Sequence, residues 1–189
     1  MDARQTLIDE LRAHALILGE VVLTSGRTAQ YYVDAKRATL RPAGFRALGE
    51  LVAAQATAWG ATAVGGLTMG ADPVACAALA GGFGGSAFFV RKETKQHGLQ
   101  RRIEGPVLEP GERCCIVEDV VTTGGSTLEA IDAVREAGLE IVGVISVLDR
   151  LAGGGERIAE ATGGAPYVPL ATIDDVHPDR DDRLSSTAS

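Results

Sequence analysis

Apolar and polar residues follow two different patterns along the chain, and the change comes near residue 41. Residues 2–18 place apolar side chains on one helical face and are followed by a glycine, which predicts an amphipathic helix. Residues 20–23 and 30–34 have strand character on either side of a Ser-Gly-Arg turn, so we expect a hairpin there. The first 40 residues should therefore form a small unit of one helix and one hairpin, called the hood below.

From residue 41 onward, short apolar runs alternate with segments of helical periodicity. The expected helices are 42–59, 71–80, 126–137 and 154–162, and the expected strands are 61–65, 86–90, 113–117 and 140–148. The alternation and the continuously apolar strands predict an α/β fold, with a parallel sheet covered by helices on both faces. Ligands of such sheets bind at the carboxyl ends of the strands.

Composition is compatible with one globular domain. Hydrophobic residues make up 46% of the 189 residues, enough for a full core. We expect a single domain over residues 1–171, with the hood at about 1–40 and the core at about 41–171. Residues 172–189 are acidic and polar, which predicts a flexible tail.

The formal net charge of −7 argues against a general binder of nucleic acids or anionic membranes, because either would need a basic face. The longest apolar runs, such as 141–148, have only strand length, and no leader-like segment opens the chain, so we expect a cytoplasmic protein. Cys76, Cys114 and Cys115 form neither an even disulfide framework nor a metal-binding spacing. We expect them to be small buried residues.

The most informative stretch is residues 114–127, Cys-Cys-Ile-Val-Glu-Asp-Val-Val-Thr-Thr-Gly-Gly-Ser-Thr. It begins as a buried strand, and Glu118 and Asp119 should close that strand at the edge of the sheet. The loop that follows is rich in glycine and hydroxyl groups and leads into a helix. Its members are Thr122, Thr123, Gly124, Gly125, Ser126 and Thr127.

This order suits a sugar phosphate. Unpaired backbone N–H groups at a helix N-terminus hold a phosphate, and adjacent carboxylates accept hydrogen bonds from vicinal hydroxyls and favour positive charge at an anomeric carbon. A Walker loop would need a lysine after its glycines, and a Rossmann loop would place the glycines ahead of the acid, so neither spacing fits. An ordinary strand-turn-helix remains the plain alternative.

Residues 114–126 resemble the phosphoribosyl pyrophosphate (PRPP) signature of the type I phosphoribosyltransferases. The resemblance implies that Glu118 and Asp119 bind the ribose hydroxyls and that residues 122–127 bind the 5-phosphate. A second glycine loop, Gly65-Gly-Leu-Thr-Met-Gly-Ala71, also follows an apolar strand and opens a helix. In the family this position receives the pyrophosphate, so the resemblance implies that Met69 and Gly70 bind PRPP. The plain alternative is an ordinary turn, in which glycine is also common.

Residues 91–105 form a long polar segment without core periodicity, as lids often do. Five Arg or Lys residues and one His fall within twelve positions of an acidic chain, and such groups stabilise a departing pyrophosphate. A solvated charge run is the alternative. The segment resembles the catalytic loop of the orotate phosphoribosyltransferases, which reaches over the other subunit of a homodimer. The resemblance implies catalytic roles for Arg91, Lys92, Lys95 and His97, together with Asp119.

Two further stretches resemble the orotate side of that family. The first is Leu23 to Arg27 followed by Tyr31 and Tyr32, and the second is the strand end at Arg150. The guanidinium of Arg150 would match a planar carboxylate. The resemblance implies orotate contacts from Thr24, Tyr31, Tyr32, Thr122 and Arg150. The chain departs from the family where many relatives have lysine near the site, at Thr24 and at Met69-Gly70.

The resemblance implies transfer of ribose 5-phosphate from PRPP to N1 of orotate in pyrimidine (UMP) biosynthesis, giving orotidine 5-monophosphate and pyrophosphate. Mg²⁺ is the implied cofactor, held mainly by PRPP and water rather than directly by the protein. Two alternatives stay open: transfer to a purine or other base, and a regulator that binds PRPP without catalysis. The second would need a nucleic-acid-binding part, for which the chain has no basic face.

Overall fold

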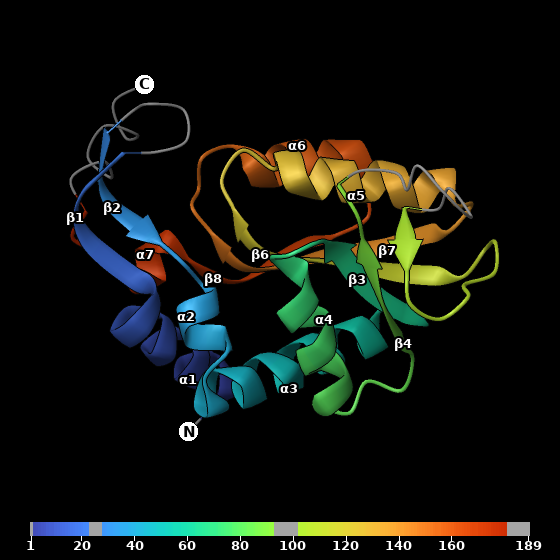
Figure 1. The fold of residues 1–189 in the computed structure, drawn as a ribbon, viewed down its shortest axis with the longest axis horizontal. Helices are drawn as coiled ribbons and strands as arrows, with labels where there is room; N and C mark the ends of the chain where they lie inside the picture. Colours follow the sequence, from blue (N-terminus) through green and yellow to red (C-terminus); the bar gives the residue numbers. More distant parts are fainter. Residues whose placement is uncertain (1, 23–27, 93–101, 181–189) are drawn as a thin grey trace.

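The computed structural model describes residues 2–22, 28–92 and 102–180, which fold into a core sheet and the hood (Figure 1). The strands of the described core sheet, in spatial order, are β5 (Ile103–Glu104), β4 (Ser86–Val90), β3 (Ala63–Leu67), β6 (Arg113–Val121), β7 (Glu140–Asp149) and β8 (Tyr167–Thr172). Neighbouring strands are parallel except for β5, which runs antiparallel to β4. The expected α/β architecture is confirmed.

Helices cover both faces of this sheet, with α3 (Pro42–Ala58) and α4 (Ala71–Ala80) on one face and α5 (Gly125–Glu136) and α6 (Gly154–Thr162) on the other (Figure 1). Side chains alternate between the two faces along β6. Cys115 packs in the hydrophobic cluster that contains α3 and α4, whereas Cys114 packs in the cluster that contains α5. Both thiols are free and buried, but Cys76 on α4 is exposed, so the expectation of burial is wrong for Cys76.

The hood differs from expectation at its first element. Its helix α1 (Ala3–Glu10) continues only as a π-helical turn, Leu11–Ala15, and strand β1 (Leu16–Val22) begins at once. The prediction of a helix over 2–18 is therefore wrong after residue 15, because Leu16 pairs with Val33 of β2 (Thr28–Val33) in the antiparallel hairpin. The short helix α2 (Lys36–Thr39), which the sequence pattern did not predict, follows the hairpin.

The hood packs against the core through apolar residues. Leu7 and Leu11 are fully buried in the same cluster as Leu48 and Val52 of α3. Figure 1 accordingly places the hood at one end of the core, beside the start of α3. This arrangement brings β2 and α2 toward the sheet edge at which β6 and β7 end.

The chain from 172 to 180 is ordered structure rather than the predicted tail. Helix α7 (Ile173–Val176) begins with a capping box between Thr172 and Asp175, and it buries Ile173 and Val176. Asp175 also accepts a hydrogen bond from Arg4 of α1 at 3.0 Å, which ties this segment to the hood. The prediction of a tail from residue 172 is thus wrong for 172–180, and residues 181–189 lie outside the described residues.

Some core strands extend beyond their predicted limits. Strand β3 spans 63–67 rather than 61–65, and β6 continues to Val121 rather than ending before Glu118. β6 continues because Val120 and Val121 still pair with Leu148 and Asp149 of β7, after the pairing with β3 has ended at Ile116. Strands β5 and β8 and helix α7 were not predicted. No helix of the described ranges is long and apolar enough to cross a membrane.

Candidate active site

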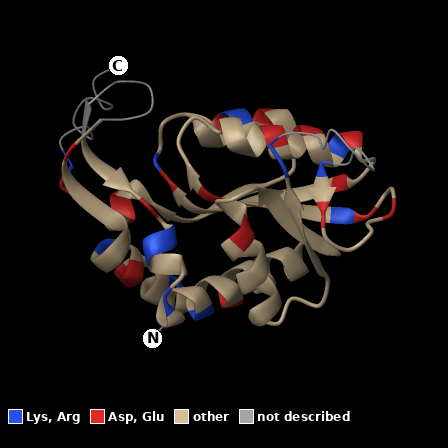
Figure 2. Ribbon diagram, viewed as in Figure 1, with Lys and Arg blue, Asp and Glu red and all other residues tan. Residues whose placement is uncertain are grey.

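Three loops meet at the carboxyl ends of β3, β6 and β7, at the edge of the sheet that faces the hood (Figure 1). They are residues 68–70 after β3, residues 122–124 after β6 and residues 150–153 after β7. Figure 2 shows charged residues of both signs between the hood and these strand ends. The site predicted from the sequence is therefore assembled from neighbouring parallel strands.

The phosphate loop, residues 122–127, turns from β6 into α5. Gly124 has a φ of 80°, a left-handed conformation that favours glycine, and α5 starts at the exposed Gly125. The N–H groups of the first helical turn have no partner within the helix, which makes this turn suitable for a phosphate. Ser126 is exposed, whereas the Thr127 hydroxyl is buried and donates to Glu118 Oε2 at 3.3 Å. Thr127 thus supports the acidic pair rather than facing the phosphate site.

Helix α6 supports the phosphate loop from outside. A Cβ atom on Gly154 would lie 2.6 Å from the Thr122 carbonyl oxygen and 2.9 Å from Gly124 N, so only glycine fits between the two segments. Arg157 Nη1 donates to the Thr123 carbonyl oxygen at 2.6 Å. Gly154 and Arg157 were not among the predicted site residues, because only the tertiary structure brings α6 to the loop.

Glu118 and Asp119 lie in β6 and point to opposite faces of the sheet. Glu118 is only 4% exposed, and its Oε1 accepts the backbone N–H of Asp119 at 3.1 Å. Burial, followed by the negative charge of Asp119, raises the pKa of Glu118 to about 8. Asp119 points toward the hood, and its Oδ1 accepts the backbone N–H of Val120 at 2.8 Å. Asp119 is therefore the more accessible of the two carboxylates.

Lys36 is a site residue that the sequence analysis missed. It lies in α2, and its Nζ is 3.1 Å from Asp119 Oδ2 and 3.1 Å from Asp34 Oδ1. Burial alone would lower the pKa of Lys36, but the charges and hydrogen bonds of Asp119 and Asp34 outweigh it and raise that pKa. The feature of the sequence that could have indicated Lys36 is a lysine two residues after the Tyr-Tyr-Val-Asp strand. It lies in a helix of only four residues, which is too short to show a periodic pattern.

The glycine loop after β3 also reaches Asp119. A Cβ atom on Gly70 would lie 2.5 Å from Asp119 Oδ1, so the backbone of residue 70 packs directly against this carboxylate. Met69 is 71% exposed. A pocket of about 480 Å³ adjoins this loop, lined by Thr68, Phe89, Arg91, Lys92 and Glu104. It places the first two cations of the predicted catalytic loop beside the loop assigned to pyrophosphate, whereas Lys95 and His97 lie outside the described residues.

The residues that the resemblance assigns to orotate join the core to the hood. The guanidinium of Arg150 lies over the Tyr31 ring, with Cζ 4.9 Å from the ring centroid. Arg150 Nε is buried, and the described residues offer it no hydrogen-bond partner. Tyr32 is 39% exposed, on the opposite face of β2 from the buried Tyr31. Thr24 lies outside the described residues.

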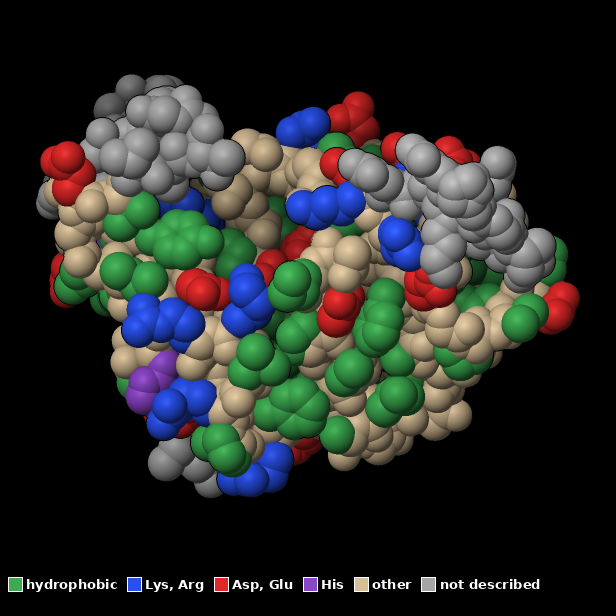
Figure 3. All heavy atoms as spheres, in the orientation of Figure 1, with side chains coloured by type: hydrophobic (Ala, Val, Ile, Leu, Met, Phe, Trp, Pro, Cys, Tyr) green, Lys and Arg blue, Asp and Glu red, His purple; other side chains and the backbone are tan. Residues whose placement is uncertain are grey.

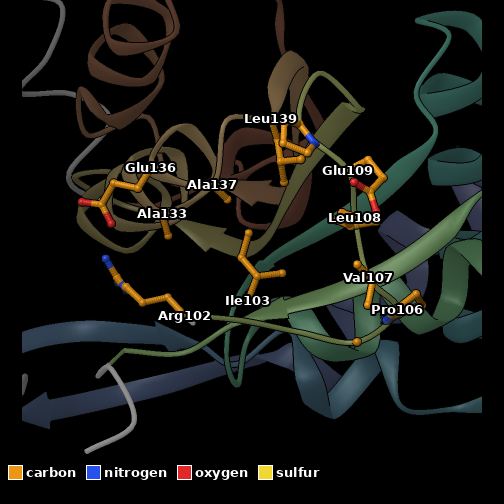
Figure 4. A pocket seen from close by; sticks show the side chains of 12 residues that line it. Arg102, Ile103, Pro106, Val107, Leu108, Glu109, Ala133, Glu136, Ala137 and Leu139 are labelled. Atoms are coloured by element: carbon orange, nitrogen blue, oxygen red, sulfur yellow. The ribbon is translucent and has the colours of Figure 1, made fainter. Parts of the chain in front are cut away.

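A larger pocket, of about 580 Å³, lies away from these loops (Figure 4). It is lined by the segment from Arg102 to Pro110 and by the end of α5, including Ala133, Glu136 and Ala137. Because α5 starts at the phosphate loop, its last turn is far from the donor site. We therefore place the active site at the strand ends and not in the larger pocket.

Comparisons with known proteins identify the family of the chain. The phosphoribosyl transferase domain family matches residues 49–167. A relative from Corynebacterium glutamicum (strain R), named orotate phosphoribosyltransferase, is 48% identical over 177 residues, which cover 93% of this chain and 95% of the relative. The structure of Mycobacterium tuberculosis H37Rv orotate phosphoribosyltransferase in complex with Fe(III) dicitrate matches with a TM-score of 0.83 and 43% identity, covering 93% of this chain and 99% of that one. The structure of the same enzyme in complex with PRPP matches with a TM-score of 0.78 and 39% identity, covering 92% of this chain and 98% of that one.

The phosphate loop, the preceding acidic pair and the α/β core define the class of protein as a phosphoribosyltransferase. Since a relative of nearly the same length is 48% identical, the chain belongs to the family of orotate phosphoribosyltransferases. The family resemblance seen in the sequence is thus confirmed.

Proposed function

We propose that the protein transfers ribose 5-phosphate from PRPP to N1 of orotate, giving orotidine 5-monophosphate and pyrophosphate in pyrimidine (UMP) biosynthesis. The observation that carries the proposal is the contact between the two halves of the site. The backbone N–H of Arg150, on the orotate side, donates to the carbonyl oxygen of Val121 at 2.9 Å, directly before the phosphate loop. Donor and acceptor groups therefore lie on adjacent strand ends.

Each part of the site has a defined task in this reaction. The bond between C1 of the ribose and pyrophosphate breaks with its electron pair leaving on pyrophosphate, and N1 of orotate forms the new bond after losing its proton. The α5 N-terminus holds the 5-phosphate, and Asp119 accepts the ribose hydroxyls and stabilises the positive charge that develops at C1. Arg91 and Lys92, with Lys95 and His97 of the same loop, neutralise the leaving pyrophosphate, and closure of that loop keeps water out.

Arg150 selects the base. Its guanidinium can pair with the carboxylate of orotate through two parallel hydrogen bonds, and the Tyr31 ring beneath it fixes the plane of the group. Thr122, Tyr32 and Thr24 complete the orotate side in this proposal. Uracil lacks the carboxylate and would leave the guanidinium of Arg150, including its buried Nε, without that partner, so it should be a poor acceptor.

Mg²⁺ is the proposed cofactor. The described part of the chain contains no group of three or more His, Cys, Asp or Glu side chains that could hold a metal ion. In this proposal the ion takes most of its oxygen ligands from PRPP and water, with the Asp119 carboxylate available to its water shell. When bound, Mg²⁺ would neutralise charge on the pyrophosphate.

A homodimer, with the loop of residues 91–105 shared between subunits, is part of the proposal. Leu40, Met69 and Leu79 are 61%, 71% and 43% exposed, and hydrophobic side chains gather over α3 and α4 on the surface in Figure 3. Such surfaces often mark subunit interfaces. Mixing Lys95→Ala subunits with Asp119→Asn subunits should restore activity if one subunit's loop serves the other's site. A purified heterodimer without activity would exclude sharing.

A cytoplasmic location also belongs to the proposal. The cysteines Cys76, Cys114 and Cys115 are free thiols, as is usual for proteins of a reducing compartment.

A panel of acceptors tests the proposed base. The protein is incubated with PRPP and Mg²⁺ and with orotate, uracil, hypoxanthine or adenine, and the nucleotide products are identified by mass. We expect orotidine 5-monophosphate from orotate and at least about a hundredfold slower product formation from the other bases. A purine nucleotide as the main product would support the alternative acceptor, and PRPP binding without any product would support a regulator.

A further inference from the structure

The carboxylate of Asp119 is enclosed by two elements that the sequence separates widely. Gly70 of the glycine loop packs on one side, so that a Cβ atom at position 70 would lie 2.5 Å from Asp119 Oδ1. Lys36 of the hood approaches from another side, with Nζ 3.1 Å from Asp119 Oδ2. A side chain at position 70 would require the Asp119 carboxylate to shift, and the loop residues Thr68, Met69 and Gly70 carry no positive charge.

Lys36 supplies a positive charge at this point. Its ammonium group lies between the carboxylates of Asp34 and Asp119, at 3.1 Å from each, and the Asp119 side chain is only 14% exposed. Ion pairs on fully exposed surfaces contribute little, but the Lys36–Asp119 pair is partly shielded from water. The pair also joins α2 of the hood to β6 of the core.

The contacts fix the orientation of the Asp119 carboxylate. Oδ1 accepts the N–H of Val120 at 2.8 Å, and Oδ2 accepts a hydrogen of Lys36 Nζ at 3.1 Å. Each carboxylate oxygen can accept a further hydrogen bond, so both remain able to bind vicinal hydroxyl groups. A carboxylate held in place before binding loses less conformational freedom when the sugar arrives.

We propose that Lys36 is a positioning residue for PRPP: its ammonium group orients Asp119 and balances the charge of that carboxylate at a place where Gly70 carries no side chain. The inference rests on the proposed phosphoribosyl transfer and adds a hood residue to the donor side of the site. The competing explanation is that Lys36 only fastens the hood to the core. That explanation predicts a loss of stability without a selective loss of donor binding.

The test is an equilibrium titration of the full-length protein with PRPP and Mg²⁺ by calorimetry, without orotate. Lys36→Met should weaken PRPP binding by about tenfold to a hundredfold, the usual effect of losing a hydrogen bond to a charged group. Lys36→Arg, which keeps the charge, should restore most of the affinity. The matched control is Arg37→Met, which removes one positive charge from an exposed neighbour in the same helix and should change affinity less than about twofold.

A double-mutant comparison shows whether Lys36 acts through Asp119. In an Asp119→Asn background, Lys36→Met should weaken PRPP binding less than about threefold, because the charge it balances is gone. An equal loss in both backgrounds, unchanged affinity in Lys36→Met, or an equal loss in Arg37→Met would each overturn the inference. If Lys36→Met does not fold, Lys36→Gln takes its place under the same criteria.

The steady-state constants provide a second readout. Lys36→Met should raise KM for PRPP much more than KM for orotate, and equal changes in both would count against a donor-positioning role. Because the titration contains no orotate, it tests Lys36 whichever base is the acceptor. A wild-type protein that binds PRPP but does not consume orotate would refute the proposed function and leave this inference standing.

Discussion

The guanidinium of Arg150 rests on the ring of Tyr31, with 4.9 Å between Cζ and the ring centroid. The ring of His177 meets the same tyrosine edge-on, with 5.3 Å between centroids. Strand β2 of the hood, the end of β7 and the segment after α7 therefore converge on one aromatic ring. In the proposed function, the acceptor side of the site is therefore built from segments that lie far apart in the chain.

Tyr31→Leu should raise KM for orotate by about threefold to tenfold, because the guanidinium loses the aromatic face that fixes its plane. Tyr31→Phe keeps the ring, so its KM for orotate should lie closer to that of the wild type than the KM of Tyr31→Leu does. The measurement is steady-state kinetics with orotate varied at saturating PRPP. An unchanged KM in Tyr31→Leu would show that the stacking has no part in binding the base.

Two glycines near the phosphate loop should respond differently to alanine. Gly154→Ala places a methyl group 2.6 Å from the Thr122 carbonyl oxygen, so we expect a loss of about 1–3 kcal/mol in the free energy of unfolding and about a tenfold rise in KM for PRPP. Gly125→Ala meets no described protein atom within 4 Å and should leave stability unchanged within about 1 kcal/mol. It should still raise KM for PRPP, because the methyl group enters the turn that holds the phosphate.

Chemical denaturation measures the free energy of unfolding of each variant. Steady-state kinetics on the folded variants then measures KM for PRPP, which separates the effect on stability from the effect on binding. If Gly125→Ala binds PRPP normally, the first turn of α5 does not hold the phosphate. If Gly154→Ala is as stable and active as the wild type, the contact between α6 and the loop is unimportant.

The buried Glu118 should make stability depend on pH. Since the pKa of Glu118 is raised from 4.5 to about 8, mainly by burial, the folded protein binds more protons than the unfolded chain between these values. The free energy of unfolding contributed by this group therefore falls as the pH rises through that window. The side chain at position 118 of the Glu118→Gln variant cannot ionise. Over the same pH range, the free energy of unfolding of this variant should therefore fall by at least about 1 kcal/mol less than that of the wild type. Urea unfolding at several pH values measures the difference, and parallel curves for the two proteins would contradict it.

The three thiols should differ in reactivity. Burial, helped by the charge of Glu112, raises the pKa of Cys114 to about 12, and burial followed by the neighbouring Cys114 raises the pKa of Cys115. Cys76 is exposed. In dilute protein, where no second subunit covers α4, a thiol reagent should therefore modify one cysteine per folded chain quickly, and Cys76→Ser should abolish that rapid phase. Rapid modification of two or three thiols in the folded protein would contradict the packing of β6.

Much of the fold could be predicted from local patterns, and the exceptions have physical reasons. The helices 71–80 and 154–162 and the strand 86–90 agree with the structure residue by residue, because glycines and loops bound clear periodic segments. Leu16 to Leu18 fitted a helical pattern, but pairing with β2 makes them a strand and leaves Leu18 66% exposed. A local pattern cannot show such a partner.

The candidate site could be proposed from the sequence where adjacent residues carry the chemistry, but not where distant segments meet. The acidic pair and the phosphate loop are contiguous in sequence, so the order of residue types was informative. Lys36 and Gly154 gain their importance only through contacts with Asp119 and Thr122, far away in the chain. The opposite directions of Glu118 and Asp119 follow from strand alternation, which became relevant only when β6 proved to continue through both residues.

The most direct test of the account is the stoichiometry of the reaction. The loss of ultraviolet absorbance of orotate and the release of pyrophosphate are followed together with purified protein, PRPP and Mg²⁺. The account predicts one pyrophosphate released for each orotate consumed, with no loss of orotate when PRPP or Mg²⁺ is omitted. Pyrophosphate release that continues without orotate, or orotate that remains intact while PRPP binds, would contradict it.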